Sequence, residues 1–159
     1  MAVISNGTTL IDAGAISVGS GKYTLIKTLT PNNASTAAFI DGTDSVVMDN
    51  TYPIYVFKCI DIHGDSEDGR FSFQVNAAGA SGFNETVTSN FFNARRNQGD
   101  SSSVLAAVTG YDQAQGTSYQ NISDASGKAA TPERTHSGTL TIYNPSNTTF
   151  ATHFMSEFS

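Results

Sequence analysis

Apolar and polar residues alternate with a period of two along much of the chain. In YTLIKTLT, residues 23–30, every second side chain falls on the same side. This is typical of a β-strand, because successive side chains of a strand point to opposite faces. RFSFQVN alternates more cleanly and predicts a strand with Phe71, Phe73 and Val75 pointing inward. Gln74, which lies between them, is predicted to point outward.

The longest apolar run is YPIYVFKCIDI, residues 52–62. Apolar side chains occupy both faces of this run, which predicts a central strand that is covered on each side. Pro53 is compatible with this prediction because it stands at the start of the strand. Residues 103–109, SVLAAVT, predict another strand, although the two adjacent alanines leave a helix open.

Two sequences predict tight turns. Asp41-Gly42 separates two short apolar runs and has the composition of a hairpin turn. Residues 144–147, Asn-Pro-Ser-Asn, separate GTLTIYN from TFATHFM. Proline sets φ for a turn and asparagine accepts turn conformations, so we expect a second hairpin here.

No segment shows the helical i, i+3, i+4, i+7 stripe, and strands alternate with breaker residues along the chain. This pattern predicts an all-β fold, an antiparallel β-sandwich or jelly roll, formed as a single domain over residues 1–159. Residues 1–20 are expected to form an N-terminal arm. Residues 110–138 are expected to form a long polar loop, interrupted by a short strand near 119–122. The predicted core comprises Ile54, Val56, Phe57, Phe71, Phe73, Leu140 and Ile142.

Charged residues make up only 14% of the chain against a usual ~25%, so Ser, Thr, Asn and Gly do most of the solvating. The 14 acidic residues outnumber the 8 basic ones, which gives a net charge of -6. A nucleic-acid partner is not expected, because phosphate binding needs a basic face. No membrane partner is expected, since no stretch approaches the ~20 apolar residues of a spanning helix. The N-terminus lacks the basic and apolar regions of a secretory signal.

The segment DIHGDSEDG, residues 61–69, collects residue types that bind metal ions or move protons. An EF-hand loop that began at Asp61 would need Gly at its sixth position and Glu at its twelfth, but both positions are serine. A zinc site would need more His or Cys ligands than the single histidine here. A solvated hairpin connection is therefore the leading interpretation. The alternative is a weak cation site formed by Asp65, Glu67 and Asp68.

The remaining motifs predict no catalytic residue and no cofactor. GSGKY, residues 19–23, lacks the first glycine and the Ser or Thr of a phosphate-binding loop, and no G-x-S-x-G elbow occurs. A hydrolase with paired carboxylates, such as a surface depolymerase, stays open as a third hypothesis, because the separation of such a pair is set in space. The single cysteine, Cys59, excludes an internal disulfide and is predicted to be a buried core residue.

Aromatic residues among polar ones are the candidates for ligand binding. Tyr111 and Tyr119 lie in the predicted long loop, and such rings offer flat apolar faces to sugars. Arg95-Arg96 follows two phenylalanines and is expected either to lie in an exposed loop or to stack on a partner. A carbohydrate- or receptor-binding module is therefore the second functional hypothesis. The absence of Trp counts against it, since indole offers the largest stacking face.

Four stretches carry a resemblance to a known group of proteins: MAVISNGTTLI, LIKTLT, AFIDGTDSVVMDNTYPIYVFKCIDIH and SGTLTIYNPSNTTFATHFMS. Together they resemble small β-rich virion proteins encoded in the structural modules of tailed bacteriophages, especially phages of marine bacteria. The shared motifs are patterns of strands and turns, and they skip residues 77–135. The resemblance implies a non-enzymatic part of the virion, tail-associated or on the capsid exterior, and carries over no functional residue. It implies other virion proteins and copies of itself as partners, with a host surface glycan as a further candidate.

The resemblance also implies more strands after the motif HF-x-S, whereas this chain stops at Ser159. Either this variant is shorter or the sequence lacks its end. A shorter variant would leave an unpaired sheet edge, which invites strand addition from a neighbouring subunit. The expected location is the virion, after synthesis in the host cytoplasm.

Overall fold

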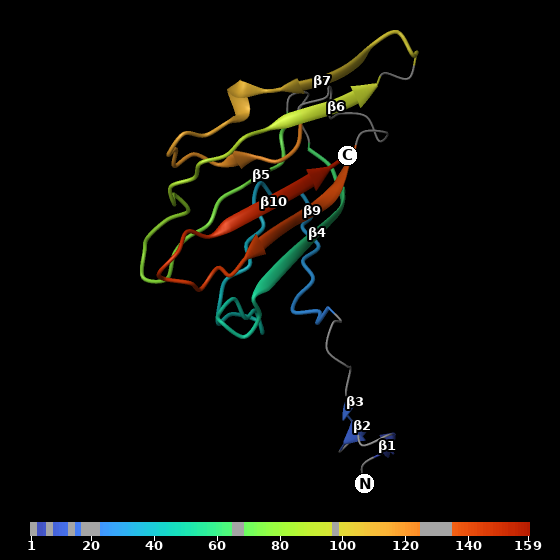
Figure 1. The fold of residues 1–159 in the computed structure, drawn as a ribbon, viewed down its shortest axis with the longest axis vertical. Helices are drawn as coiled ribbons and strands as arrows, with labels where there is room; N and C mark the ends of the chain where they lie inside the picture. Colours follow the sequence, from blue (N-terminus) through green and yellow to red (C-terminus); the bar gives the residue numbers. More distant parts are fainter. Residues whose placement is uncertain are drawn as a thin grey trace. The chain divides into compact units, whose positions relative to one another are not determined.

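The computed structural model describes most of the chain (Figure 1). The described residues are 3–5, 8–12, 15–16, 23–64, 69–96, 99–124 and 135–159. They form two compact units, unit 1 (Met1–Thr51) and unit 2 (Tyr52–Ser159). The division does not test the prediction of a single domain, which stays a prediction.

Unit 1 contains a three-stranded antiparallel sheet in the order β1-β2-β3. The strands are β1 (Val3–Ser5), β2 (Thr8–Asp12) and β3 (Ala15–Ile16). β2 pairs with both of its neighbours, so each strand lies beside the one that precedes it in the sequence.

The segment 23–30 does not form the strand that its alternation predicts. It has no regular secondary structure, and Tyr23 and Leu25 are each 80% exposed. Alternation alone does not make a strand, because the backbone N–H and C=O groups also need a partner ladder.

The turn predicted at Asp41-Gly42 is present. Gly42 has a φ of 75°, a conformation that glycine adopts without a steric cost. Its N–H donates to the Val46 carbonyl at 3.0 Å, and the Thr43 N–H donates to the Ile40 carbonyl at 3.1 Å. The described residues on either side do not pair as strands, so the turn is confirmed but the hairpin is not.

Unit 2 is built around a three-stranded antiparallel sheet in the order β10-β9-β4 (Figure 1). Its strands are β4 (Ile54–Ile62), β9 (His136–Tyr143) and β10 (His153–Phe158). The prediction that residues 52–62 form a central strand is wrong, because β9 is central and β4 is an edge of this sheet. The apolar side chains on one face of β4 misled that prediction, since several of them are exposed.

The hairpin predicted at residues 144–147 joins β9 to β10. The Asn147 N–H donates to the Asn144 carbonyl at 3.1 Å, which closes the turn. Asn144 has a φ of 49°, a conformation that asparagine tolerates better than most residues. The Asn147 Oδ1 accepts the N–H groups of Thr149 and Phe150 at 2.7 and 2.9 Å. The hairpin prediction is confirmed.

The inner face of the β10-β9-β4 sheet carries the core of unit 2. Its buried residues are Tyr55, Leu140 and Ile142. The ring of Phe154 packs edge-on against Phe73, with ring centroids 4.9 Å apart. Phe158 packs against Phe71 at 5.7 Å. Such pairs add about 0.5–1.5 kcal/mol each beyond the area that they bury.

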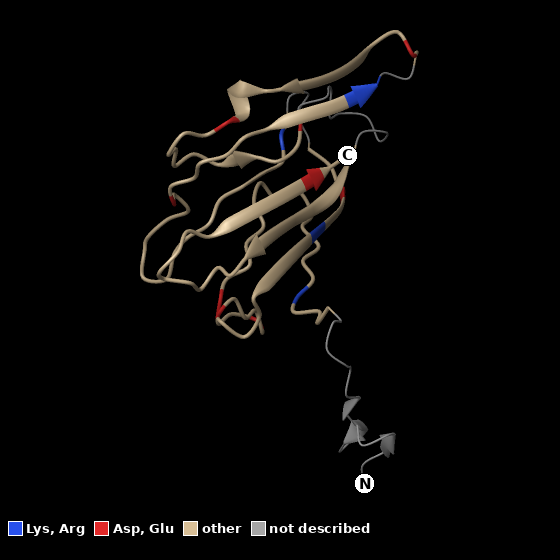
Figure 2. Cartoon of the chain, in the orientation of Figure 1, with Lys and Arg blue, Asp and Glu red and all other residues tan. Residues whose placement is uncertain are grey.

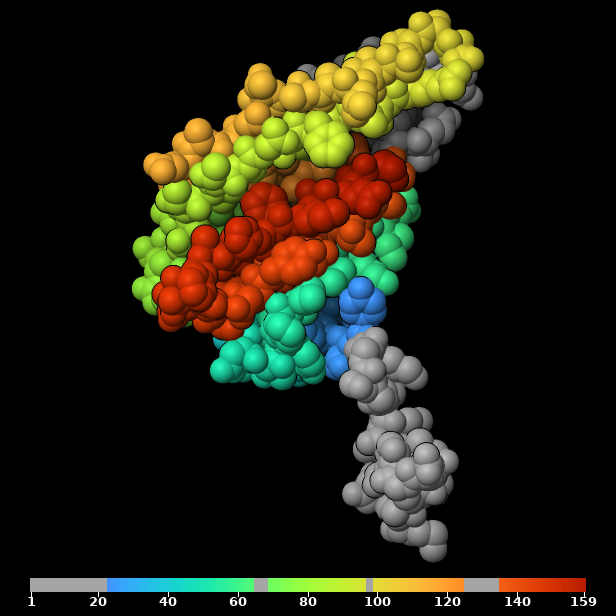
Figure 3. Space-filling view, viewed as in Figure 1, coloured from blue at the N-terminus to red at the C-terminus, as the bar shows by residue number. Residues whose placement is uncertain are grey.

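The opposite face of this sheet, called the outer face, consists of three cross-strand rows. The rows are Ile54–Tyr143–His153, Val56–Thr141–Met155 and Lys58–Thr139–Glu157. Each row runs from β4 across β9 to β10, because residues directly opposite each other in an antiparallel sheet share a face. Figure 3 shows the three strands at the surface of unit 2.

Two short two-stranded antiparallel sheets complete unit 2. They pair β5 (Ser72–Phe73) with β8 (Gln120–Asn121), and β6 (Phe92–Arg96) with β7 (Ser103–Ala107). A single turn of 3-10 helix, η1 (Thr109–Tyr111), follows β7. The strand predicted over residues 103–109 is present as β7 but ends at Ala107, and these residues form no α-helix. β8 confirms the short strand predicted near 119–122, but the predicted loop extends too far, since β9 begins at His136.

The predicted fold class, all-β with antiparallel strands, is confirmed, and the described residues contain no α-helix. The sandwich or jelly-roll arrangement stays a prediction. Of the predicted core, Leu140 and Ile142 are buried. Val56, Phe57, Phe71 and Phe73 are half-buried. Ile54 was predicted wrongly, since it is 49% exposed on the outer face.

Candidate functional site

The acidic segment 61–69 begins at the end of β4. The N–H of Asp61 donates to Ser137 Oγ at 3.0 Å, and its carboxylate lies 3.2 Å from His63 Nε2. Both side chains are exposed, by 44% for His63 and 67% for Asp61. The cation candidates Asp65, Glu67 and Asp68 lie outside the described residues, so the turn and cation alternatives both stay predictions. Elsewhere in the described part of the chain, no three His, Cys, Asp and Glu side chains gather into a metal site.

Tyr111 is held by a cluster of charged and aromatic side chains, called the Tyr111 cluster: Arg70, Phe91, Tyr111 and Asp124. The Arg70 guanidinium lies 5.0 Å from the centre of the Tyr111 ring, and its Nε donates to the tyrosine hydroxyl at 3.0 Å. That hydroxyl donates to Asp124 Oδ1 at 3.3 Å. Phe91 meets the same ring edge-on at 5.2 Å. A sugar would therefore have to displace Arg70 before it stacked on that face of Tyr111.

Asp124 joins the Tyr111 cluster to the β6-β7 hairpin. Its Oδ2 accepts the Asn93 amide at 2.7 Å and lies 3.8 Å from Arg95 Nη1. Arg96, the other half of the adjacent basic pair, forms an ion pair with Asp100 within the same hairpin. Both arginines are thus directed at acids of their own chain. The Oδ1 of Asn93 is buried and has no hydrogen-bond partner.

Two buried glutamines form hydrogen bonds that connect the loops of unit 2. The pattern of apolar and polar residues did not predict that either would be buried. Gln74 was predicted to point outward, but its side chain is buried and its Nε2 donates to the carbonyls of Glu85, Thr117 and Ser118 at 3.0–3.1 Å. Gln120, only 2% exposed, donates to the Tyr111 carbonyl at 3.1 Å. An amide can satisfy several buried backbone groups at once, which explains why polar residues occupy these sites. No sequence signal marks them, because their partners are distant in the chain.

Tyr119 differs from Tyr111 in being accessible. It precedes β8 and is 50% exposed. Of the two candidates for ligand binding, it is the one whose ring can meet a ligand without breaking a contact described above.

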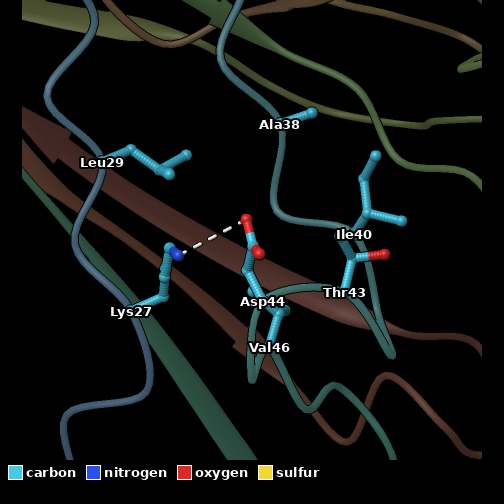
Figure 4. Close-up of a pocket in the computed structure, with 7 residues that line it drawn as sticks. All are labelled: Lys27, Leu29, Ala38, Ile40, Thr43, Asp44 and Val46. Atoms are coloured by element: carbon cyan, nitrogen blue, oxygen red, sulfur yellow. Dashed lines mark ion pairs between the residues drawn. The ribbon is translucent and has the colours of Figure 1, made fainter.

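Unit 1 contains a small pocket of about 170 Å³ (Figure 4). It is lined by Lys27, Leu29, Ala38, Ile40, Thr43, Asp44 and Val46. Lys27 Nζ lies 3.5 Å from Asp44 Oδ2, and the Asp44 side chain is 74% exposed. The volume is below the ~300–1,000 Å³ that is usual for small-molecule sites, and the charges within it are already paired.

Several strands of unit 2 expose large apolar side chains. On the outer face, Met155 is 62% exposed, and Ile60, which follows the same alternation along β4, is 76% exposed. On the β6-β7 hairpin, Phe92 and Leu105 are 66% and 78% exposed. Ala107 lies directly opposite Phe92, and Ala94 lies directly opposite Leu105, so all four side chains share one face of the hairpin. These exposed apolar side chains can bury area against another protein.

Comparison with protein-family models, with curated proteins and with solved structures found no match to this chain. Across the described residues, no helix has the length and apolar character needed to cross a membrane.

Proposed function

We propose that the chain is a non-enzymatic structural component of a tailed-phage virion, tail-associated or on the head exterior, that acts through contacts between subunits. The observation that carries the proposal is the apolar surface on regular strands of unit 2, in particular Met155 and Ile60 beside the sheet and Phe92 and Leu105 on the hairpin. Apolar side chains exposed on the faces of strands can contribute buried area to a protein interaction site.

The distribution of charge supports the same proposal. The strands of unit 2 carry few charged side chains (Figure 2). Surface ion pairs contribute little and weaken with salt, whereas apolar contact persists. A subunit that relies on apolar strand faces would therefore stay bound when a particle is diluted or enters high salt. The resemblance of the sequence to phage virion proteins adds to this argument, and a β-sandwich would be a suitable scaffold for it.

The proposal is tested by analysing purified particles of the phage that encodes the chain. Quantitative mass spectrometry should find the chain in banded virions at a fixed ratio to the major capsid protein. A wash in high salt should not remove it. A chain that is abundant in infected cells but missing from the particle would refute the proposal.

The accessible ring of Tyr119 favours one alternative function, a carbohydrate- or receptor-binding module on the virion surface. A glycan array probed with the purified chain tests it. Binding that is lost in Tyr119→Ala but kept in Tyr143→Ala, which alters an exposed tyrosine of β9, would support this function. Tyr111→Ala is a poorer test, because it also removes the contacts with Arg70 and Asp124.

A further inference from the structure

The free edge of β10 carries backbone groups without partners. β10 ends the sheet order β10-β9-β4, so one of its edges faces no strand of this sheet. Ser137 and Ser159 donate to each other's carbonyls at 3.0 and 2.9 Å, so they form a hydrogen-bonded pair of the antiparallel ladder. Such pairs alternate along the ladder, so the N–H and C=O groups of Phe154, Ser156 and Phe158 point away from β9. No hydrogen bond among the described residues reaches these groups.

The segment 24–30, TLIKTLT, has the opposite deficiency, because it has the sequence of a strand but no ladder. Its side chains alternate as those of a strand do, yet it has no regular secondary structure. Within the described part of the chain, its backbone groups form no hydrogen bond. A segment of this kind can add as a strand to the exposed edge of a sheet, where main-chain hydrogen bonds supply the affinity.

From these two observations we infer that residues 24–30 of one copy of the chain add as an antiparallel strand to the β10 edge of a second copy. A single chain leaves both the segment and the edge without partners, and a second copy supplies what each lacks. The other edge of the sheet is a poorer acceptor, because a register shift between Cys59 and Ile62 interrupts the ladder of β4. Figure 3 shows a hollow between β10 (red) and β6 (yellow-green), where the added strand would lie.

The outer face of the added strand fixes its register. When Lys27 is placed opposite Glu157, Leu29 falls opposite Met155, so an opposite-charge pair and an apolar pair form next to each other. A shift by two residues puts Lys27 opposite Met155 in one direction, and Leu29 opposite Glu157 in the other. Lys27 already forms an ion pair with Asp44 at 3.5 Å, but the Asp44 side chain is 74% exposed, and such a pair contributes little. The charge therefore sets the register, while the backbone groups supply the binding.

The inner face agrees with the same register. Ile26 falls opposite Phe158 and Thr28 opposite Ser156, so an apolar side chain meets the ring and a small polar one meets the serine. These are also the residues whose backbone groups face each other, because Ser156 and Phe158 point theirs away from β9. A parallel strand centred on the same charge pair would place Ile26 beside Ser156 and Thr28 beside Phe158. The side chains therefore favour the antiparallel direction.

Each copy offers one donor segment and one acceptor edge, so the contact is head-to-tail. Such contacts close into a ring, of which a reciprocal pair is the smallest, or extend into a filament, depending on the rotation between copies. Either assembly suits a virion component, and this use of the contact rests on the proposed function. The pairing itself does not, because it can be measured on the purified chain.

Disulfide cross-linking between two different variants tests the inference. Leu29→Cys and Met155→Cys are made separately in a Cys59→Ala background and mixed at about 100 µM each with the oxidant diamide. Residues opposite each other in an antiparallel pair have Cα atoms ~4.5–5.5 Å apart, which a disulfide can span. Peptide mapping should find a disulfide that joins positions 29 and 155 of different chains. A control mixture with Leu105→Cys, at an exposed apolar residue of β7, in place of Met155→Cys should give at least about ten-fold less cross-link.

Proline variants separate backbone pairing from contact between side chains. Thr28→Pro removes an N–H group that faces β10 of the other copy, and Ser156→Pro removes one that faces the added strand. Each should weaken association in sedimentation velocity by at least about ten-fold. Neither N–H is hydrogen-bonded within the described residues, so circular dichroism should show that both variants are folded. The control is Thr36→Pro, at another exposed threonine for which the described residues show no backbone hydrogen bond, and it should associate as the wild type does.

Three outcomes would overturn the inference. The first is a cross-link between positions 29 and 155 that is no more frequent than in the control mixture. The second is a disulfide that forms only when both cysteines are in one chain, because the segment then pairs with its own β10. The third is association that both Thr28→Pro and Ser156→Pro leave unchanged.

Failure of the proposed function looks different from failure of this inference. A chain that exchanges strands in solution but is never found in particles would refute the virion role and leave the pairing standing. A chain that is found in particles but gives no cross-link between positions 29 and 155 would refute the pairing and leave the virion role standing.

Discussion

Gln120 connects segments of unit 2 that lie far apart in the sequence. Its Nε2 donates to the carbonyls of Tyr111 and Asn121, and its Oε1 accepts the Ser89 hydroxyl at 2.5 Å. With 2% of its surface exposed, the side chain cannot exchange these partners for water. A buried group that loses its partner bears the full cost of desolvation, so the amide matters more than its net hydrogen-bond energy suggests.

Gln120→Met keeps the length of the side chain but removes its donors and acceptor. We expect the free energy of unfolding to fall by about 1–3 kcal/mol, because the Ser89 hydroxyl and two carbonyls lose their partner. Urea denaturation of the variant and the wild type measures this difference in the free energy of unfolding. Gln115→Met, the same substitution at an exposed residue, should change the free energy by less than about 0.5 kcal/mol. Equal losses in both variants would show that the amide of Gln120 contributes nothing specific.

Cys59 illustrates how burial controls chemistry at a single residue. Its side chain lies on the inner face of β4, and partial burial raises the pKa of the thiol above its ordinary value of 9.0, because the thiolate is poorly solvated there. The thiol should therefore react with iodoacetamide at neutral pH more slowly than in the urea-unfolded chain. When the reaction rate is plotted against pH, the midpoint of the curve for the folded chain should lie at a higher pH than the midpoint for the unfolded chain.

The same shift makes stability depend on pH. The folded state holds the thiol proton more tightly than the unfolded state, so stability falls as the pH rises from 9.0 through the higher folded pKa. Below pH 9.0 the contribution is fully present. The difference in free energy of unfolding between wild type and Cys59→Ala should thus shrink above pH 9.0 and stay constant below it. A constant difference throughout would contradict the shift.

At the scale of the strand, Gly138 sets how closely β10 can approach β9. It lies opposite both Cys59 and Phe158, and a Cβ at this position would come within 2.7 Å of the Phe158 ring and even closer to the Glu157 carbonyl. Gly138→Ala should lower the free energy of unfolding by about 1–3 kcal/mol, the usual cost of overpacking. Gly110→Ala is the control, since no atom lies within 4 Å of the added Cβ. Thermal unfolding of the two variants compares them, and equal melting temperatures would contradict the close approach.

The elements show which features of the fold the sequence could predict. Alternation and turn chemistry correctly placed the hairpin at 144–147 and the turn at Asp41-Gly42, because both depend on residues that are neighbours in the chain. The edge position of β4 could not be predicted, since it depends on which distant strands form partners. The inward position of Gln74 was missed for the same reason, as its bonding partners come from two separate loops.

At the scale of the molecule, the candidate site was harder to predict than the fold. In the sequence, Tyr111 and Tyr119 are equivalent candidates for ligand binding. Only the tertiary structure distinguishes them, because Arg70 contacts the Tyr111 ring from a distant segment. The composition of the outer face of the β10-β9-β4 sheet has no signature in the sequence either, since it arises from the pairing of β4 and β10 with β9. A surface that acts by contact is defined by strand register, which pattern reasoning does not supply.

We expect the two units to differ in their ability to fold alone. Unit 2 contains most of the buried apolar residues and a three-stranded sheet with an aromatic inner face. Among residues 23–51 of unit 1, Val46 is the only buried hydrophobic residue. A chain that short buries too little surface to offset its conformational entropy without a substantial core. Residues 52–159 expressed alone should therefore give a β-rich circular dichroism spectrum and a cooperative urea transition, and residues 1–51 alone should give neither. A cooperative transition in residues 1–51 would show that unit 1 is an independent domain, against the prediction of a single domain over 1–159.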